Sequence, residues 1–406
     1  MRRVNRAAGE LIGVVSPSFA GPLAGTRVLE IGSIGPGPFC AMLFADLGAD
    51  VVRVDRVSGE GMSGPNQDFR AELLHRGRRS IAVDLKHRDG SAVVLDLAER
   101  ADVLIEGFRP GVAERLGIGP DVCAERNPAL VYGRMTGYGQ DGPMAQTAGH
   151  DLNYLGQSGV LSLIGRKDQP PTPPLNLVAD FGGGGFLLGF GILAALLERQ
   201  CSGRGQVVDA AMIEGAALLA IPFFGYLQTG AWRPERGTNL VDSGAPFYDV
   251  YETADGRWLS VAAIESRFYA DLVTLLELPA DLPDRDDRAA WPGLKETFAE
   301  AVRKRTRDEW CARAEGLSPC VAPVLDAGEA PGNEHNRARH VFVTRDGLTQ
   351  PAPAPRFSRT PAQLGRRSPV PGEHSVEILR DWGVPAERQL RWRQSGAVMV
   401  ASTMPA

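Results

Sequence analysis

The segment from Arg27 to Asp55 constrains the fold more than any other stretch of the chain. Residues 27–31 and 50–55 are short apolar runs that predict buried strands. Between them lie a Gly- and Pro-rich loop (32–38) and a helical pattern (39–47). Strand, helix and strand in this order predict a βαβ unit, in which the strands are parallel and the crossover is right-handed. We therefore expect an α/β fold built on a parallel sheet.

Later segments extend this pattern and then change it. Strands are expected at 102–106, 130–134 and 206–210, and apolar helices at 186–197 and 212–228. From about Arg233 the pattern becomes hairpin-like, because the expected strands 247–253 and 257–263 flank an Asp-Gly turn. Charged helical patterns follow at 267–276 and 294–314, and a last helix is expected at 373–382.

A chain of 406 residues is long enough for two domains. Four segments are therefore predicted. They are an N-terminal extension (1–20), a large parallel-sheet domain (21–232), a small α+β domain (233–330) and a C-terminal segment (331–406) that returns to the large domain.

Bulk properties exclude several classes of protein. The net charge of −5 gives no reason to expect nucleic acid or a membrane surface as a partner. Five scattered cysteines without a C-x-x-C pair argue against a disulfide framework or a zinc site and indicate a reducing compartment. The longest apolar run (186–197) is too short to cross a bilayer, and 11–15 is too short for the core of a signal peptide. We expect a cytoplasmic protein.

The first Gly-rich turn raises the alternative of a dinucleotide site. Gly32, Gly35 and Gly37 are spaced as G-x-x-G-x-G, whereas the fingerprint is G-x-G-x-x-G. Pro36 and Pro38 also remove backbone donors that would bind a pyrophosphate. The glycines are therefore better explained as ordinary βαβ structure.

A basic segment (56–88) follows the second strand. Most of its Arg, Lys and His side chains are expected to be solvated. The carboxyl end of a parallel strand is nevertheless where α/β folds bind ligands, and this cluster would suit a polyanion such as a nucleotide phosphate.

His150 is the strongest candidate for chemistry. Among six histidines it alone lies between a glycine and an aspartate, in the run 149–154. A second carboxylate, Asp180, ends the run 176–180 and is followed by Phe181 and four glycines. A lone His is more often structural, but the acidic and amide residues nearby favour general acid–base catalysis.

Other chemistries fit less well. Residues 156–159 do not match the G-x-S-x-G nucleophile elbow, and no phosphate-binding P-loop is present. His335 and His340 lack the spacing of a metal site. We expect neither a metal nor a bound cofactor.

Several motifs resemble the family III CoA-transferases. They lie at 35–42, 46–56, 79–86, 108–111 and 136–143. Within this family, 149–154 and 176–184 resemble the α-methylacyl-CoA racemase branch. The resemblance begins at about Pro22 and runs into the C-terminal region, so it leaves out the first 20 residues.

The resemblance implies a fold and a mechanism. Family members are interlocked homodimers in which each subunit has a large Rossmann-like domain and a small one. The acyl end of the CoA thioester lies near the partner's small domain. In the racemases a His and an Asp flank the α-carbon and a Glu supports the His, and these positions match His150, Asp180 and Glu265. The implied substrate is a 2-methylacyl-CoA of lipid and fatty acid metabolism, and CoA is part of that substrate.

The resemblance also implies a set of substrate-binding residues, which lie near the ends of the second and third strands, at Arg115 and around His150. They are Arg56, Val83, Asp84, Leu85, Lys86, Arg115, Gly149, Asn153, Tyr154 and Asn176. Backbone amides near Asp151 are expected to donate hydrogen bonds to the enolate oxygen. The glycines after Asp180 are expected either to let the thioester approach the backbone closely or to form a flexible turn.

Two alternatives remain open. In the transferase branch a carboxylate at the position of Asp151 attacks the thioester and forms a mixed anhydride. His150 directly before Asp151, and the Asn176/Asp180 pair, favour the racemase. A CoA-binding scaffold without catalysis is the third possibility.

Overall fold

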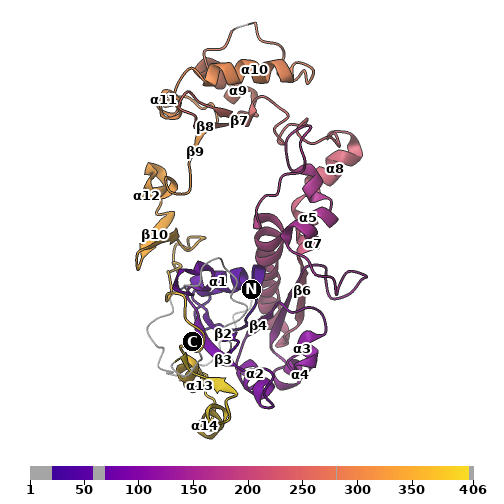
Figure 1. Cartoon of the computed structure of the whole chain (residues 1–406), viewed down its shortest axis with the longest axis vertical. Helices are drawn as coiled ribbons and strands as arrows, with labels where there is room; N and C mark the ends of the chain where they lie inside the picture. Colours follow the sequence, from indigo (N-terminus) through magenta and orange to yellow (C-terminus); the bar gives the residue numbers. More distant parts are fainter. Residues whose placement is uncertain (1–20, 58–68, 280, 402–406) are drawn as a thin grey trace, which may run out of the picture.

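The structure, a computed structural model, describes residues 21–57, 69–279 and 281–401. The predicted N-terminal extension (1–20) lies outside the described residues. Figure 1 shows an elongated molecule with a large unit around one sheet and a small unit at the opposite end from the C-terminal helices. The exact limits predicted for the four segments remain predictions.

The large unit contains a seven-stranded sheet of order β12-β3-β2-β1-β4-β5-β6. Its neighbouring strands are parallel, except that β12 runs antiparallel to β3. The strands are β1 Arg27–Ile31, β2 Asp50–Asp55, β3 Arg79–Val83, β4 Val103–Glu106, β5 Val131–Thr136, β6 Val207–Ala211 and β12 Val398–Met399. The expectation of an α/β fold on a parallel sheet is confirmed.

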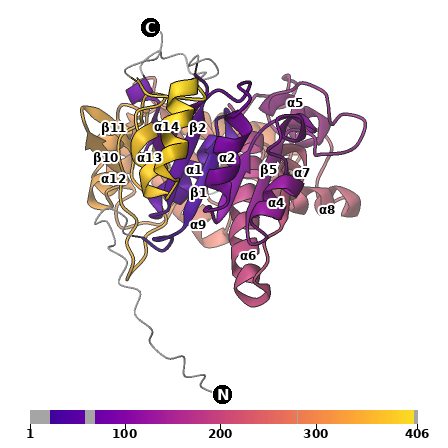
Figure 2. The same ribbon diagram turned by 90° about the horizontal axis from the view of Figure 1, so that it is seen from below.

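Helices cover both faces of this sheet, because successive residues of a strand point to opposite sides. Val28 packs in one core and Leu29 in the other. The Val28 face carries α1 Pro36–Asp46, η4 Leu177–Phe186, α6 Leu187–Ser202 and α7 Met212–Leu219. The Leu29 face carries α2 Gly90–Ala98, α4 Pro120–Arg126, α13 Ser375–Asp381 and α14 Ala386–Ser395. Figure 2 looks onto the end of the molecule where α2, α13 and α14 lie.

After the last predicted helix, the chain forms two more elements that the sequence did not predict. The expected helix at 373–382 is α13, but α14 and the short strand β12 follow it. Trp382 and Trp392 are buried in the core, and the Trp382 indole donates to Asp50 Oδ2 at 2.8 Å. A two-residue strand is too short for a periodic pattern, so its pairing with β3 could not be foreseen.

The expected apolar helix at 186–197 is longer than predicted. Continuous helical structure runs from Leu177 to Ser202, because the four glycines lie inside a helix and do not end one. By length and composition alone this stretch could cross a membrane, as could the bent pair α7 and α8 (Ile221–Thr229). In the structure α6 packs against β5 and β6.

The expected helix at 212–228 is instead two helices. α7 ends at Leu219 and α8 begins at Ile221, with their axes 55° apart. Pro222 lies at the start of α8, where its missing N–H is tolerated, whereas inside a continuous helix it would break a hydrogen bond.

The small unit is an antiparallel sheet of order β7-β8-β9 covered by helices. Its elements are β7 Tyr248–Glu252, β8 Trp258–Ala262, β9 Val321–Val324, α9 Ser266–Leu275, α10 Trp291–Val302 and α11 Arg307–Arg313. The expected helix at 294–314 is broken, because Thr306 and Glu309 form a capping box that starts α11. Phe298 and Trp310 are fully buried in this core.

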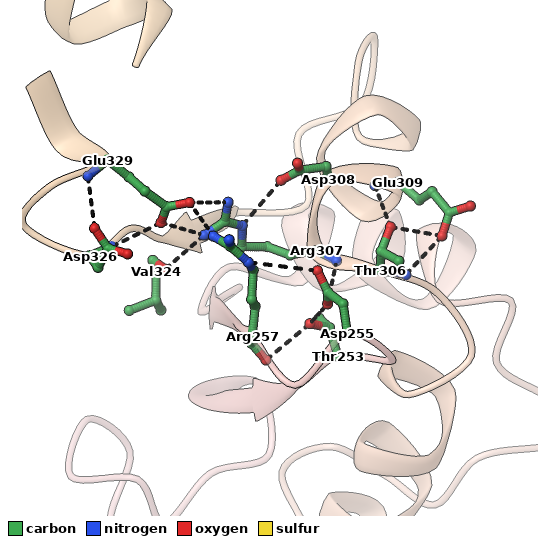
Figure 3. Close-up of polar contacts among 10 residues, drawn as sticks. All are labelled: Thr253, Asp255, Arg257, Thr306, Arg307, Asp308, Glu309, Val324, Asp326 and Glu329. Atoms are coloured by element: carbon green, nitrogen blue, oxygen red, sulfur yellow. Dashed lines mark hydrogen bonds and ion pairs between the residues drawn. The ribbon is translucent and has the colours of Figure 1, made fainter. Parts of the chain in front are cut away.

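A polar cluster holds the chain where it leaves the small unit (Figure 3). Arg307 ion-pairs with Glu329 at 2.9 Å and with Asp308 at 3.1 Å, and Arg257 also contacts Glu329. The chain then returns to the large unit through α12 Glu334–Ala338 and the hairpin of β10 Phe342–Arg345 and β11 Leu348–Pro351. Two separate segments therefore join the units (Figure 1).

Candidate active site

The main cleft lies at the carboxyl edge of the sheet. Its volume is about 890 Å³, and its walls include the turns that follow β1 (33–37), β4 (107–110) and β5 (137–138). β1 has β2 on one side and β4 on the other, so strand order reverses at this point. In open α/β sheets ligands bind at such a switch point, outside the carboxyl ends of the strands.

The turn after β1 packs directly against the candidate acid. Gly35 has a φ of 70°, and a β-carbon built on it would lie 3.1 Å from Asp180 Oδ2. Pro36 already belongs to the first turn of α1, so the predicted loop 32–38 is shorter than expected. Proline is favoured there because the first helical N–H groups have no partner in the helix. Gly35 thus leaves room for the Asp180 carboxylate.

His150 lies in extended backbone immediately before α5 Asp151–Gln157, and it is exposed to the cleft. Its backbone N–H donates to Asn153 Oδ1 at 3.0 Å. The Tyr154 hydroxyl donates to the Gly149 carbonyl, and its ring packs edge-on against Tyr138 at 4.9 Å between ring centres. Burial raises the pKa of Tyr154 to about 12, so this hydroxyl stays protonated. Asn153 and Tyr154 therefore hold the loop that presents His150.

Asp180 lines the same cleft from η4. Burial raises the pKa of Asp180, and the nearby charge of Asp151 acts in the same direction. Asn176 opposes this effect by donating from Nδ2 to Asp180 Oδ2 at 3.1 Å, as does His150 through its charge. A carboxyl group with a raised pKa is suited to both giving and taking a proton.

The glycines after Asp180 serve helix packing. η4 is a ten-residue π-helix, a rare form that is frequently found at functional sites. A β-carbon on Gly183 would lie 2.7 Å from the Ala216 amide nitrogen, and one on Gly185 would lie 2.7 Å from the Phe39 ring. The sequence predicted that these glycines either let the thioester approach the backbone or form a flexible turn. Both predictions are wrong for Gly183 and Gly185. The glycines let η4 lie close against α7 and α1, which fixes Asp180 in the cleft.

Asp151 is turned away from solvent. Its side chain is 4% exposed, and Oδ2 accepts hydrogen bonds from the backbone N–H groups of Ala179 and Asp180, both at 2.8 Å. A carboxylate at these amides also compensates the positive end of η4. Asp151 therefore joins the start of α5 to the residue that carries the candidate acid.

The structure brings seven predicted site residues to one cleft. They are Gly149, His150, Asp151, Asn153, Tyr154, Asn176 and Asp180. Glu265 does not line this cleft, since it lies in the small unit between β8 and α9 and is exposed.

The predicted CoA-binding residues lie around the cleft without lining it. Arg56 follows β2, Asp84–Lys86 follow β3, and Arg115 ends the short helix α3 Val112–Arg115. Arg56, Lys86 and Arg115 are exposed. Val83 is buried in the core and pairs with Val398, so any contact it makes with a ligand would come from its backbone.

Much of the basic segment is structural. Arg76 and Arg78 are buried and pair with Asp46 and Glu30, each at 2.6 Å. Arg79 pairs with Asp50 at 2.6 Å. Burial and neighbouring arginines lower the pKa of His75 to about 2. The expectation that this cluster is either solvated or free to bind a polyanion is wrong for these four residues.

Ser33 and Arg109 are two polar residues of the cleft for which the sequence predicted no role. Ser33 follows β1, and its hydroxyl is buried without a protein partner. Arg109 is exposed at the turn after β4. Arg109 belongs to the Phe-Arg-Pro-Gly motif, which carried the family resemblance but no assigned role. Its position after a parallel strand could have indicated a role, because ligands bind at the carboxyl ends of such strands.

Within residues 21–57, 69–279 and 281–401, no group of three or more His, Cys, Asp or Glu side chains is arranged to hold a metal ion. The cleft instead combines an imidazole, a carboxyl group of raised pKa and the amides at a helix start. This arrangement is that of a proton-transfer site on a doubly wound α/β scaffold.

Comparison with known proteins agrees with this class. The chain belongs to CoA-transferase family III, whose sequence profile matches residues 23–375. It is 48% identical to the α-methylacyl-CoA racemase of Mus musculus, over 91% of this chain and 95% of that protein. Identity to the Homo sapiens α-methylacyl-CoA racemase is 44%, over 90% and 94%. The crystal structure of a CAIB/BAIF family protein from Brucella suis superposes with a TM-score of 0.77 at 27% identity, covering 89% of this chain and all of that one.

Proposed function

We propose that the protein interconverts the (2R) and (2S) epimers of 2-methylacyl-CoA thioesters. The relatives named α-methylacyl-CoA racemase are similar along almost the whole chain. The cleft supports the same reaction, because His150 and Asp180 both line it and an imidazole and a carboxyl group can each give and take a proton.

The reaction requires removal of the weakly acidic proton next to the thioester carbonyl. One residue takes this proton, an enolate forms, and the other residue returns a proton to the opposite face. Each positioned acid or base contributes about 10²- to 10⁴-fold in rate. Backbone amides at the start of α5 are the proposed donors to the enolate oxygen, and such a donor is worth roughly 3–4 kcal/mol.

Similarity to the racemases along almost the whole chain is the observation that favours racemase over transferase. Asp151 Oδ2 accepts hydrogen bonds from two backbone amides of η4, and these contacts serve a racemase because they fix the backbone of Asp180. The other oxygen, Oδ1, has no protein partner, and Asp151 lines the cleft, so CoA transfer through Asp151 is the alternative function.

We further propose that the active enzyme is a homodimer and that Glu265 of one subunit supports His150 of the other. Glu265 is exposed and lies outside the cleft of its own chain. Around the cleft, η4, α6 and α7 expose large apolar side chains, including Phe186 at 56% and Phe190 at 73%. Apolar surface of this kind is typical of subunit interfaces.

CoA would be held as part of the substrate by Arg56, the 83–86 segment and Arg115, and no further cofactor is proposed. We also propose that the protein acts in the cytoplasm, in lipid metabolism. The free state of Cys40, Cys123, Cys201, Cys311 and Cys320 agrees with a reducing compartment.

The test is proton exchange in deuterated water. One epimer of a 2-methylacyl-CoA is incubated with the protein and no acceptor acid. Epimerisation with deuterium at the α-carbon is expected. Absence of exchange, together with CoA transfer once a carboxylic acid is added, would replace the racemase by the transferase.

A further inference from the structure

Glu265 lies on a short loop of the small unit, between the end of β8 at Ala262 and the start of α9 at Ser266. Its backbone is extended, and its side chain makes no hydrogen bond to the first turn of α9. Its carbonyl accepts a hydrogen bond from the Tyr269 N–H at 3.0 Å. The direction of the Glu265 carboxylate therefore depends on where the backbone of this loop is held.

Arg285 binds this loop from the segment between α9 and α10. Its Nη2 donates to the carbonyl oxygen of Ile264, which belongs to the peptide bond that joins Ile264 to Glu265. A guanidinium group makes a stronger hydrogen bond than a neutral donor does, because it carries a charge. Since a peptide bond is planar, holding this carbonyl also holds the backbone nitrogen of Glu265.

The guanidinium group of Arg285 lies over two aromatic rings. Its central carbon is 4.2 Å from the centre of the Phe247 ring and 4.7 Å from the centre of the Tyr269 ring. A planar guanidinium group stacks well on such rings. Phe247 also binds the loop through its backbone, because its carbonyl accepts from the Ala263 N–H at 2.9 Å, and Tyr269 does so at Glu265. The arginine and the two aromatic residues therefore form one support for the loop 263–265.

Arg285 is itself fixed at its backbone and at its side chain. The Trp291 indole donates to the Arg285 carbonyl at 2.8 Å, and the Arg285 side chain is only 15% exposed. Its ion pair with Asp286 is 3.6 Å long and Asp286 is 83% exposed, so this pair contributes little. The well-formed contacts of the guanidinium group are therefore those to the loop and to the two rings.

We propose that Arg285 is a positioning residue for Glu265. It sets where the Glu265 carboxylate projects from the small unit, and it touches neither the substrate nor the reacting atoms. This inference rests on the proposed function, in which Glu265 of one subunit supports His150 of the other. A displacement of about 1 Å near a reacting group can cost about 10²-fold in rate, so loss of this support should be visible in turnover.

Arg288 provides a matched control in the same segment. Its guanidinium carbon lies 5.4 Å from the centre of the Trp291 ring, and its side chain donates to the Ala231 carbonyl at 3.5 Å and not to the loop 263–265. Arg285→Ala and Arg288→Ala each remove a guanidinium group that lies over an aromatic ring, so a general loosening of the small unit would affect both. For each variant, kcat and KM are measured for α-deuterium exchange in one epimer of a 2-methylacyl-CoA.

Arg285→Ala is expected to lower kcat by about 10- to 10²-fold and to leave KM within about twofold, because the support acts on the reaction and not on substrate binding. Arg288→Ala is expected to leave both constants within about twofold of those of the unaltered protein. Equal losses in the two variants, or a rise in KM at unchanged kcat, would overturn the proposal. If the unaltered protein exchanges no α-proton, the proposed function itself fails.

A double-mutant cycle tests whether Arg285 acts through Glu265. Glu265→Ala has no carboxylate to position, so adding Arg285→Ala to it should lower kcat by less than about twofold. A further loss as large as that of Arg285→Ala alone would show that Arg285 acts by another route, and would overturn the proposal. An unchanged kcat in Glu265→Ala alone would instead refute the role of Glu265 in the proposed function, and the positioning role of Arg285 with it.

Discussion

Asp151→Asn separates a positioning role from a nucleophilic one. In the unaltered protein the N–H groups of Ala179 and Asp180 each lie 2.8 Å from Asp151 Oδ2. The asparagine amide has the size of the carboxylate, and its oxygen can still accept both hydrogen bonds. It has no negative charge and cannot form a mixed anhydride. The racemase reading predicts that α-proton exchange persists, within about tenfold of the unaltered rate.

The cost to stability follows from these two contacts. A hydrogen bond to a charged group contributes about 1.5–3 kcal/mol, and a neutral acceptor gives roughly half of that. Asp151→Asn should therefore lower the free energy of unfolding by about 1.5–3 kcal/mol in total. Asp151→Ala leaves both donors unpaired and should cost about 3–6 kcal/mol.

The assays are urea unfolding and deuterium exchange across a pH series. Since the charge of Asp151 raises the pKa of Asp180, its removal should lower that pKa. The acidic limb of the exchange profile should then move to lower pH. Asp121→Asn, on the exposed surface of α4, is the control. A loss of exchange beyond about 10³-fold in a folded Asp151→Asn protein would refute the positioning role.

Three further outcomes are expected. His150→Ala should reduce deuterium incorporation by about 10²- to 10⁴-fold, and in single-turnover experiments the loss should be larger from one epimer than from the other. Asn176→Ala removes a hydrogen bond that lowers the pKa of Asp180, so the acidic limb of the exchange profile should move to higher pH. In Gly215→Ala a β-carbon would lie 1.8 Å from a backbone oxygen of η4, so a drop in thermal unfolding temperature of several degrees is expected. Gly225→Ala meets no atom within 4 Å and should show no such drop.

Local patterns in the chain were sufficient for the parallel strands at the centre of the large sheet and for part of the site. β1 and β2 have the predicted limits, because buried parallel strands appear as short apolar runs between Gly- and Pro-rich loops. His150 and Asp180 could be selected because acidic and amide residues lie near them and because their motifs resemble those of the racemases. Local patterns do not show that the two residues share one cleft, because they lie thirty positions apart in the chain.

The missed features depend on partners far away in the chain. Arg76, Arg78 and Arg79 form a run of positive charge in the sequence, yet each pairs with a carboxylate from another segment. A run of glycines such as the one after Asp180 is compatible both with a turn and with a closely packed helix. Their role became clear only from the distances to α1 and α7.

The sequence therefore defined the residue types available for proton transfer and the strand ends at which a ligand binds. Packing determined which of them act together. Asp151 shows this most clearly, since its neighbours in the chain are compatible with both a nucleophile and a support. Its orientation follows from two amides of η4 that lie 28 and 29 residues further along the chain. Such long-range hydrogen bonds leave no local signature, because they depend on how η4 packs against the rest of the fold.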